Sequence, residues 1–379
     1  MRTRLLIAVL ILALVPVAPA AAGRRVNLQH DADAIHAVGV TGVLARKTTP
    51  AAGSRTAVSG VSDLATGRPV RPDGYFRIGS TNKTLVATVV LQLVAERRMG
   101  LDDPVEKWLP GFVRGNDYDS HRITVRHLLQ HTAGIYDGNF PAIDNAEQYY
   151  QRRYLTRSEE EVVKAGLSHR PDFQPGKGWA YSNTGYNLVG LMIKAVTGRP
   201  WYAEVERRII RPLRLHHTYW PGTNPRIRAP HAKGYTRFGA GEAYTDTTEL
   251  IDADASGGFI STLADQDTFQ RALFGGKLLR PAQLAEMTRT VEVNGEVTEL
   301  WKGARYGLGI FSRELACGGT VWIPGGDQLG YRIRLAVTPD GSRSAVVAMA
   351  SQLYDSMEVI FAQEAASTKL IDNALCAGH

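Results

Sequence analysis

The chain has 379 residues, of which 44% are hydrophobic and 21% charged, with 38 glycines and two cysteines. This composition excludes a disordered chain, a collagen-like repeat and a cysteine-dense scaffold, and the length allows one large domain or two modest ones. The formal net charge is +7, but the basic residues are scattered rather than gathered in runs. We therefore expect no nucleic-acid partner.

Residues 1–22 have the pattern of a secretory signal peptide. Arg2 and Arg4 precede an apolar stretch at 5–14, Pro16 interrupts it, and small residues suited to cleavage follow. We predict export, to the medium or the exterior of the cell envelope, with no membrane span left after cleavage. An uncleaved membrane anchor is the alternative, although the apolar run is short for a span.

The predicted elements place strands at both ends of the chain and helices between them. Two strands, at 38–45 and 56–62, precede an apolar helix that begins at Ser80 and stops at Gly100. Further helices are predicted at 124–131, 158–165, 185–196, 202–210, 264–274 and 356–373, and strands at 306–313, 331–337 and 344–350. The turn Pro339-Asp340-Gly341 predicts a hairpin between the last two strands.

This order predicts an α+β fold with a mostly helical domain inserted into it. The expected division is a signal peptide at 1–22, an α/β domain formed by 23–100 and 252–379, and the inserted domain at 101–251. The cleft between the two domains is the expected place for an active site.

The most informative motif is Ser80-Thr81-Asn82-Lys83 at the start of the apolar helix. A spacing of three puts Ser80 and Lys83 on one helix face, about one turn apart. The positive end of the helix dipole favours negative charge that develops at Ser80. If Lys83 is buried, desolvation lowers its pKa and lets it take the serine proton. A surface helix turn is the plainer reading of Ser-x-x-Lys alone.

Tyr181-Ser182-Asn183 is the second candidate element, just before a helix. A phenol near a lysine ammonium can be held partly ionised and move a proton to a leaving group. The amide of Asn183 could donate to a substrate carbonyl. A turn that simply precedes a helix is the alternative for this segment taken alone.

Other segments complete a recognisable set: LDDPV at 101–105, ITVRHLLQHTAG at 123–134, STLAD at 261–265 and YGLG at 306–309. Together they resemble the penicillin-recognising serine hydrolases, in the branch of class C β-lactamases and serine D-alanyl-D-alanine carboxypeptidases. The resemblance implies the β-lactamase/transpeptidase-like fold, an antiparallel sheet flanked by helices. It also implies Ser80 as acylated nucleophile, Lys83 and Tyr181 as the proton-transfer pair, and Asn183 as a substrate-binding amide.

The third motif of that family is where this sequence departs. The family carries Lys or His two residues before a glycine on the strand beside the site. Here Gly326 matches that glycine, so Pro324 stands at the basic position, and Asp327 is expected to donate the second oxyanion N–H. Proline supplies neither a cation nor a backbone donor. Arg332 and Arg334 are the nearby alternatives for positive charge.

The two cysteines, Cys317 and Cys376, are expected to form a disulfide in an exported protein. His127 and His131 have the spacing of helical zinc ligands, but Leu128 stands where a zinc protease has glutamate, so we read both as structural. The acidic run at 159–161 predicts a solvent-facing first helix turn.

These residues predict an exported serine hydrolase that works through an acyl-enzyme, without metal or cofactor, as a monomer. Peptidoglycan stem peptides are the leading substrate, which makes it a D-alanyl-D-alanine carboxypeptidase-like or β-lactamase-like enzyme. An esterase or amidase on other substrates is the enzymatic alternative. A non-catalytic wall-binding relative is the alternative from another class.

Overall fold

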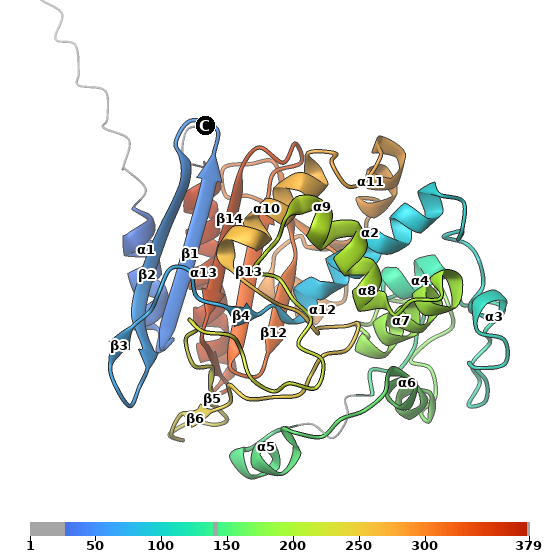
Figure 1. Ribbon diagram of the computed structural model, residues 1–379, viewed down its shortest axis with the longest axis horizontal. Helices are drawn as coiled ribbons and strands as arrows, with labels where there is room; N and C mark the ends of the chain where they lie inside the picture. Colours follow the sequence, from blue (N-terminus) through green and yellow to red (C-terminus); the bar gives the residue numbers. More distant parts are fainter. Residues whose placement is uncertain (1–26, 139–142, 377–379) are drawn as a thin grey trace, which may run out of the picture.

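The computed structural model describes residues 27–138 and 143–376 and shows an α+β fold (Figure 1). The predicted signal peptide at 1–22 lies outside the described residues, so export stays a prediction. Within those two ranges, no helix is both long enough and apolar enough to cross a membrane.

The largest sheet is antiparallel and takes its strands from both ends of the chain. Its strands are β1 (Gly42–Thr49), β2 (Gly53–Asp63), β3 (Arg68–Pro69), β8 (Val291–Glu292), β9 (Arg305–Tyr306), β10 (Phe311–Glu314), β11 (Thr320–Ile323), β12 (Gly325–Gln328), β13 (Tyr331–Val337) and β14 (Ser344–Met349). Their order is β3-β2-β1-β14-β13-β11-β10-β9-β8, and β12 also pairs with β13. Because β1 pairs with both β2 and β14, the first strands of the chain lie beside the last.

Shorter strands form two small sheets. They are β4 (Phe76–Arg77), β5 (Tyr235–Arg237), β6 (Thr245–Asp246), β7 (Ile260–Ser261) and β15 (Ser351–Leu353). β4 pairs with β7, and β5 lies between β15 and β6. β4 leads directly into the turn that carries Ser80.

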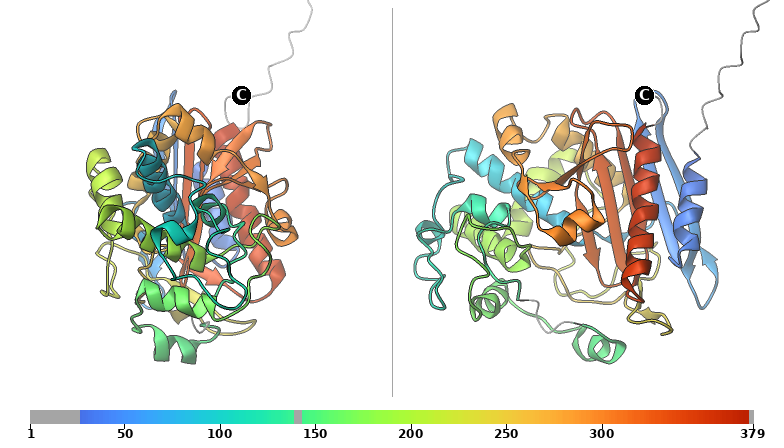
Figure 2. Two further views of the ribbon diagram at one scale, coloured as in Figure 1. Left: turned by 90° about the vertical axis from the view of Figure 1, so that its right-hand side faces the viewer. Right: turned by 180° about the vertical axis from the view of Figure 1, so that it is seen from behind.

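Helices cover both faces of the central sheet. They are α1 (Leu28–Ala37), α2 (Asn82–Ala95), α10 (Leu263–Phe274), α11 (Pro281–Met287), α12 (Gly295–Leu300) and α13 (Met357–Cys376). α1 and α13 lie side by side on one face, as the view from behind shows (Figure 2). α10 lies in front of the sheet and packs against β1 and β14 (Figure 1).

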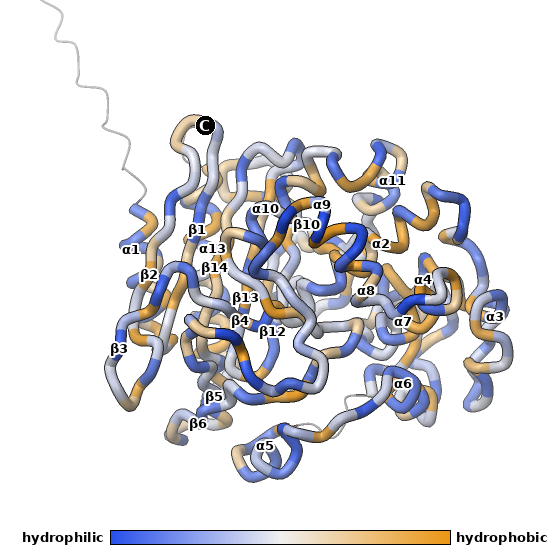
Figure 3. Tube along the Cα trace, in the orientation of Figure 1, coloured by the Kyte–Doolittle hydropathy of each residue, from blue (hydrophilic) through white to orange (hydrophobic). Residues whose placement is uncertain are grey.

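The middle of the chain supplies the remaining helices. They are α3 (Val105–Trp108), α4 (Val125–Leu129), α5 (Ala146–Arg152), α6 (Glu159–Leu167), α7 (Asn183–Thr197), α8 (Trp201–Val205) and α9 (Arg211–Leu213), with a π-helical turn η2 (Glu206–Ile210). One hydrophobic core joins these helices to the sheet, with Leu188 and Leu335 among its members. The trace of α2 inside this core is largely hydrophobic, whereas the trace around β3 is largely hydrophilic (Figure 3). The predicted domain boundaries stay a prediction.

The structure confirms the α+β class and the hairpin at 339–341, and it corrects three details. The strand predicted at 306–313 is two paired strands, β9 and β10, because the chain turns at Gly309, whose φ is +77°. β11 and β12 were not predicted. α2 begins at Asn82 after a 3₁₀ turn, η1 (Gly79–Thr81), and ends at Ala95 rather than at Gly100.

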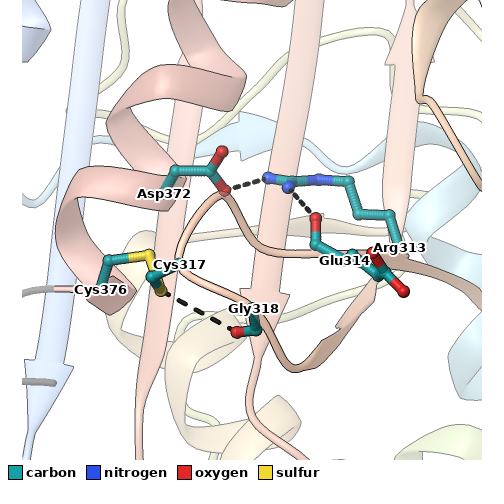
Figure 4. Close-up of a disulfide and its surroundings, with 6 residues drawn as sticks. All are labelled: Arg313, Glu314, Cys317, Gly318, Asp372 and Cys376. Carbon is teal, nitrogen blue, oxygen red and sulfur yellow. Dashed lines mark hydrogen bonds and ion pairs between the residues drawn. A yellow bond between two sulfur atoms is a disulfide. The ribbon is translucent and has the colours of Figure 1, made fainter.

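The predicted disulfide is present (Figure 4). Cys317 lies in the turn between β10 and β11, and Cys376 is the last residue of α13. Arg313 reinforces the connection, since its Nη2 lies 2.8 Å from Oδ1 of Asp372. The bond therefore holds the end of α13 against the sheet.

Candidate active site

Ser80 lies in η1, between β4 and α2, and Lys83 lies in the first turn of α2. The Nζ of Lys83 donates to the Oγ of Ser80 at 3.1 Å. Gly79 has φ +50°, a left-handed conformation that glycine adopts readily and that turns the chain from the strand into the helix. The structure therefore places Ser80 and Lys83 in contact.

Lys83 is enclosed by segments that are distant in the sequence. Its side chain is buried, and Nζ donates to Oδ1 of Asn183 at 2.6 Å and to the carbonyl of Ser256 at 3.0 Å. Burial lowers the pKa of Lys83 to about 7, against the opposing influence of nearby carboxylates, of which Asp254 is the strongest. The neutral amine is therefore accessible to Lys83 near neutral pH.

The three contacts of Lys83 determine what the neutral amine can do. A neutral amine has two N–H groups and one lone pair, and two of its three neighbours are carbonyl oxygens, which only accept hydrogen bonds. The two N–H groups therefore satisfy Asn183 and Ser256, which leaves the lone pair directed at Ser80. In this state Lys83 can accept the proton of Ser80 as that hydroxyl attacks a carbonyl.

Tyr181 lies on the other side of the nucleophile. The Nζ of Lys83 is 4.7 Å from the centroid of its ring, and Ser80 is near enough to the phenol to influence its pKa. Burial raises the pKa of Tyr181 well above 10, so the phenol is protonated here and the prediction of a partly ionised phenol is wrong. Tyr181 is a protonated hydroxyl next to Ser80, suited to passing a proton on rather than to taking the first one.

Asn183 is held by Asp137, a carboxylate that no sequence motif marks. Asp137 accepts from the backbone N–H of Asn183 at 2.8 Å, from its Nδ2 at 3.1 Å and from the N–H of Thr184 at 3.4 Å. The Nδ2 contact turns Oδ1 of Asn183 toward Lys83. One amide N–H of Asn183 is therefore already engaged by Asp137. The amide oxygen of Asn183 accepts from Lys83 rather than facing an open substrate position.

His131 supports the segment that carries Tyr181. The backbone N–H of Ser182 donates to Nδ1 of His131 at 3.1 Å. The centroids of the His131 and Tyr181 rings are 4.3 Å apart. Burial lowers the pKa of His131 well below 6.5, so the ring is neutral. Its Nε2 therefore carries the proton and donates to the hydroxyl of Tyr306 at 3.1 Å. The structural reading of His131 holds, and it includes contact with a predicted catalytic residue.

β12 approaches the Ser80 turn so closely that only glycine fits at Gly326. A Cβ there would lie 2.0 Å from the carbonyl oxygen of Ile78, and a Cβ on Gly79 would lie 3.0 Å from the backbone N of Asp327. The N–H groups of Ser80 and Asp327 thus belong to adjoining backbone segments, as an oxyanion hole requires. Pro324 immediately precedes β12 and brings no charge to this wall.

Ser80, Asn183 and Asp327 open into one cavity of about 880 Å³. Asp252, Asp254 and Glu159 also line it, together with the aromatic pair Tyr202 and Trp220, whose rings are 3.6 Å apart. Glu159 does begin α6 as predicted, but it is partly buried rather than solvent-facing, and burial raises its pKa to about 7.

In the described part of the chain, no group of three or more His, Cys, Asp or Glu residues is arranged to hold a metal ion.

Sequence reasoning therefore singled out Ser80 and Lys83, which the structure brings into contact, but missed two residues that support this site. Asp137 lies 46 residues before Asn183, and no local spacing marks it. His131 lies in a segment that resembles the family, yet its contact with Ser182 arises from folding alone.

The comparisons with known proteins agree with this geometry. The model of the family described as Beta-lactamase matches residues 29–367. A D-stereospecific amidohydrolase structure from Streptomyces sp. is 39% identical, with a TM-score of 0.79, covering 89% of this chain and 97% of that one. A D-amino acid amidase structure from Ochrobactrum anthropi SV3, complexed with L-phenylalanine amide, is 25% identical, with a TM-score of 0.78, covering 92% and 97%.

Two curated relatives match over shorter stretches. Esterase EstB of Burkholderia gladioli is 32% identical over 46% of this chain, and penicillin-binding protein 4* of Bacillus subtilis is 27% identical over 63%. The matches span about half the length of these relatives, 46% and 53%. Their names therefore do not transfer a substrate, but the family match extends over most of the sequence. The chain belongs to the beta-lactamase family of serine hydrolases.

Proposed function

We propose that the protein hydrolyses amide bonds through an acyl-enzyme on Ser80, with amides of D-amino acids as the first substrate class to test. The observation that carries the proposal is the buried Lys83, whose pKa is about 7 and whose Nζ lies 3.1 Å from the Ser80 hydroxyl. A base with a pKa near the working pH combines the correct protonation state with a sufficient drive for proton transfer.

In the proposed reaction, the lone pair of Lys83 takes the proton of Ser80 as Oγ bonds to the substrate carbonyl carbon. The backbone N–H groups of Ser80 and Asp327 stabilise the oxyanion that forms. The hydroxyl of Tyr181 donates its proton to the departing nitrogen and is reprotonated from Lys83. Water then releases the acyl group by the same steps in reverse order.

The choice of D-amino acid amides rests on the 39% identical amidohydrolase, which aligns over nearly the whole chain. The match to an esterase supports ester hydrolysis as a second activity of the same nucleophile, since an ester has a better leaving group. The D-alanyl-D-alanine carboxypeptidase-like and β-lactamase-like readings stay predictions. Pro324 weakens both, because it supplies no cation for a substrate carboxylate.

We also propose that the enzyme works outside the cytoplasm, on small acyl substrates. The Cys317–Cys376 disulfide supports this location, because such bonds persist mainly in oxidising compartments. Export and the monomeric state stay predictions.

The test compares D-phenylalanine amide, L-phenylalanine amide, D-phenylalanine methyl ester and N-acetyl-D-alanyl-D-alanine as substrates of the wild-type protein and Ser80→Ala. Hydrolysis of the D-amide, lost in the variant, with a Ser80 acyl adduct in intact-mass spectra, supports the proposal. Cleavage of the D-alanyl dipeptide alone would establish the carboxypeptidase instead. If the wild-type protein hydrolyses none of the four substrates, the proposed function is contradicted.

A further inference from the structure

Asp327 has a second feature besides its backbone N–H, namely a carboxylate held by two arginines. It lies opposite Arg332 in the pairing of β12 with β13. Nη1 and Nη2 of Arg334 donate to its two oxygens at 2.7 and 3.3 Å, and Nε of Arg332 is 3.3 Å from Oδ1. The side chain of Asp327 is 40% exposed and lines the cavity that contains Ser80, whereas those of Arg332 and Arg334 are 6% and 9% exposed.

The two arginines depend on Asp327 to different degrees. Nε of Arg334 also donates to both carboxylate oxygens of Glu364, at 3.0 and 2.9 Å. Arg332 instead reaches the uncharged Gln363, where Nη1 donates to Oε1 at 3.2 Å. Among the ion pairs of the described residues, Arg332 has Asp327 as its carboxylate partner. Without it, two buried guanidinium groups would share the single charge of Glu364.

Such an excess positive charge beside the cavity would bind an external carboxylate. A buried charge without a partner is costly, and guanidinium groups match the planar geometry of carboxylates. With Asp327 in place, the pair is neutralised and the charge that faces the cavity is negative. A substrate with a carboxylate beside the scissile bond would meet that like charge next to Ser80.

We propose that Asp327 determines substrate charge: it is a built-in carboxylate that occupies the arginine pair and makes the site reject acyl compounds with a free carboxylate next to the reacting bond. This inference rests on the proposed function, because it names the substrate class of the same site. It assigns Arg332 and Arg334 to holding Asp327 rather than to holding substrate. Neutral and cationic amides and esters are then the accepted classes.

The test measures binding in a Ser80→Ala background, where no turnover occurs. The probes are N-acetyl-D-alanine and its neutral analogue N-acetyl-D-alaninamide. Calorimetry measures the affinity of the protein for each probe. Adding Asp327→Asn is expected to tighten binding of the carboxylate about tenfold while leaving the amide within about twofold, because a like charge is removed and Arg332 is freed. Adding Arg332→Gln to this pair is expected to abolish the gain.

Asp252→Asn is the matched control, since it removes another cavity carboxylate, whose Oδ2 accepts from Gln328 rather than from an arginine. A gain confined to Asp327→Asn and lost with Arg332→Gln supports the proposal. Unchanged carboxylate binding in a folded Asp327→Asn protein would overturn it, as would an equal gain in Asp252→Asn. These outcomes do not depend on catalysis, so failure of the amidase proposal shows separately in the activity of the wild-type protein.

Discussion

The carboxylate of Asp137 accepts both the backbone N–H and the side-chain Nδ2 of Asn183, the first residue of α7. This contact orients Oδ1 of Asn183 toward Nζ of Lys83, 2.6 Å away. Asp137 also places a negative charge near Lys83, which favours the protonated lysine. Asp137 thus influences both the hydrogen bonding and the protonation of Lys83, the proposed general base.

The pH dependence of kcat/KM tests this arrangement. Because Lys83 acts as a base only when neutral, activity in the wild-type protein is expected to rise with pH through about 7 and then level off. Asp137→Asn removes a charge that stabilises the ammonium, so the pKa of Lys83 falls further and the rise is expected at lower pH. The plateau should also fall, by about 10- to 100-fold, because Asn183 loses its orientation.

Asp144→Asn serves as the control for this experiment, since Asp144 is an acidic cavity residue on the segment before α5. Its pH profile is expected to match that of the wild-type protein. An Asp137→Asn profile that keeps its midpoint, or that moves it to higher pH, would show that Asp137 does not act on Lys83.

The close approach of β12 to the Ser80 turn predicts contrasting effects at two adjacent glycines. In Gly326→Ala the new Cβ would lie 2.0 Å from the carbonyl oxygen of Ile78, so β12 must move away from Ser80. Loss of one oxyanion donor costs about 10²- to 10³-fold in kcat, and a loss of that size is expected. In Gly325→Ala the nearest atom, in the Trp301 ring, is 3.3 Å away, and activity should change little.

Steady-state kinetics and thermal unfolding of both glycine variants check this. The expected result is that Gly326→Ala remains folded and loses kcat. Equal activity in Gly325→Ala and Gly326→Ala would argue against an oxyanion hole at Asp327.

The packing of His131 on Tyr181 predicts a loss in kcat rather than in KM. Asn is a suitable replacement because it tolerates the left-handed backbone of His131, whose φ is +61°. His131→Asn removes the ring that lies 4.3 Å from Tyr181, so the phenol is held less firmly near Ser80. We expect kcat to fall by about 10-fold or more with KM within about twofold, as for a misplaced catalytic group.

His127→Asn is the control, because His127 is in the same helical segment and its Nδ1 accepts only from the nearby backbone N–H of Thr124 among the described hydrogen bonds. It is expected to leave kcat nearly unchanged. If both histidine variants lose kcat and stability together, His131 contributes to folding alone and not to the position of Tyr181.

The disulfide predicts a measurable stability difference. Cys317 and Cys376 close a loop with a sequence separation of 59 residues, for which the chain-entropy model gives about 4 kcal/mol. Replacing both cysteines with serine should lower the free energy of unfolding by about 2–4 kcal/mol, measured by denaturant titration. Adding reductant should destabilise the wild-type protein and leave the double variant unchanged. A wild-type protein indifferent to reductant would contradict a stabilising bond.

Local features of the fold and site were readable from the sequence because short-range geometry encodes them. A serine three residues before a lysine at a helix start lies on the same face in any α-helix, so Ser80 and Lys83 could be paired without a structure. The hairpin at 339–341 and the apolar α2 follow from turn chemistry and periodicity in the same way. The break at Gly309 is not predicted, because its apolar neighbours Leu308 and Ile310 continue a strand-like pattern.

The properties that make the site reactive were decided by tertiary structure. Burial lowers the pKa of Lys83, and the oxygens that accept its hydrogen bonds belong to Asn183 and Ser256, 100 and 173 residues away. The orientation of Arg334 toward Asp327 and Glu364 likewise depends on how α13 packs against β13. Desolvation and long-range contacts arise only when the whole chain closes around these groups, so the sequence alone determined which residues could react and the fold determined how they do.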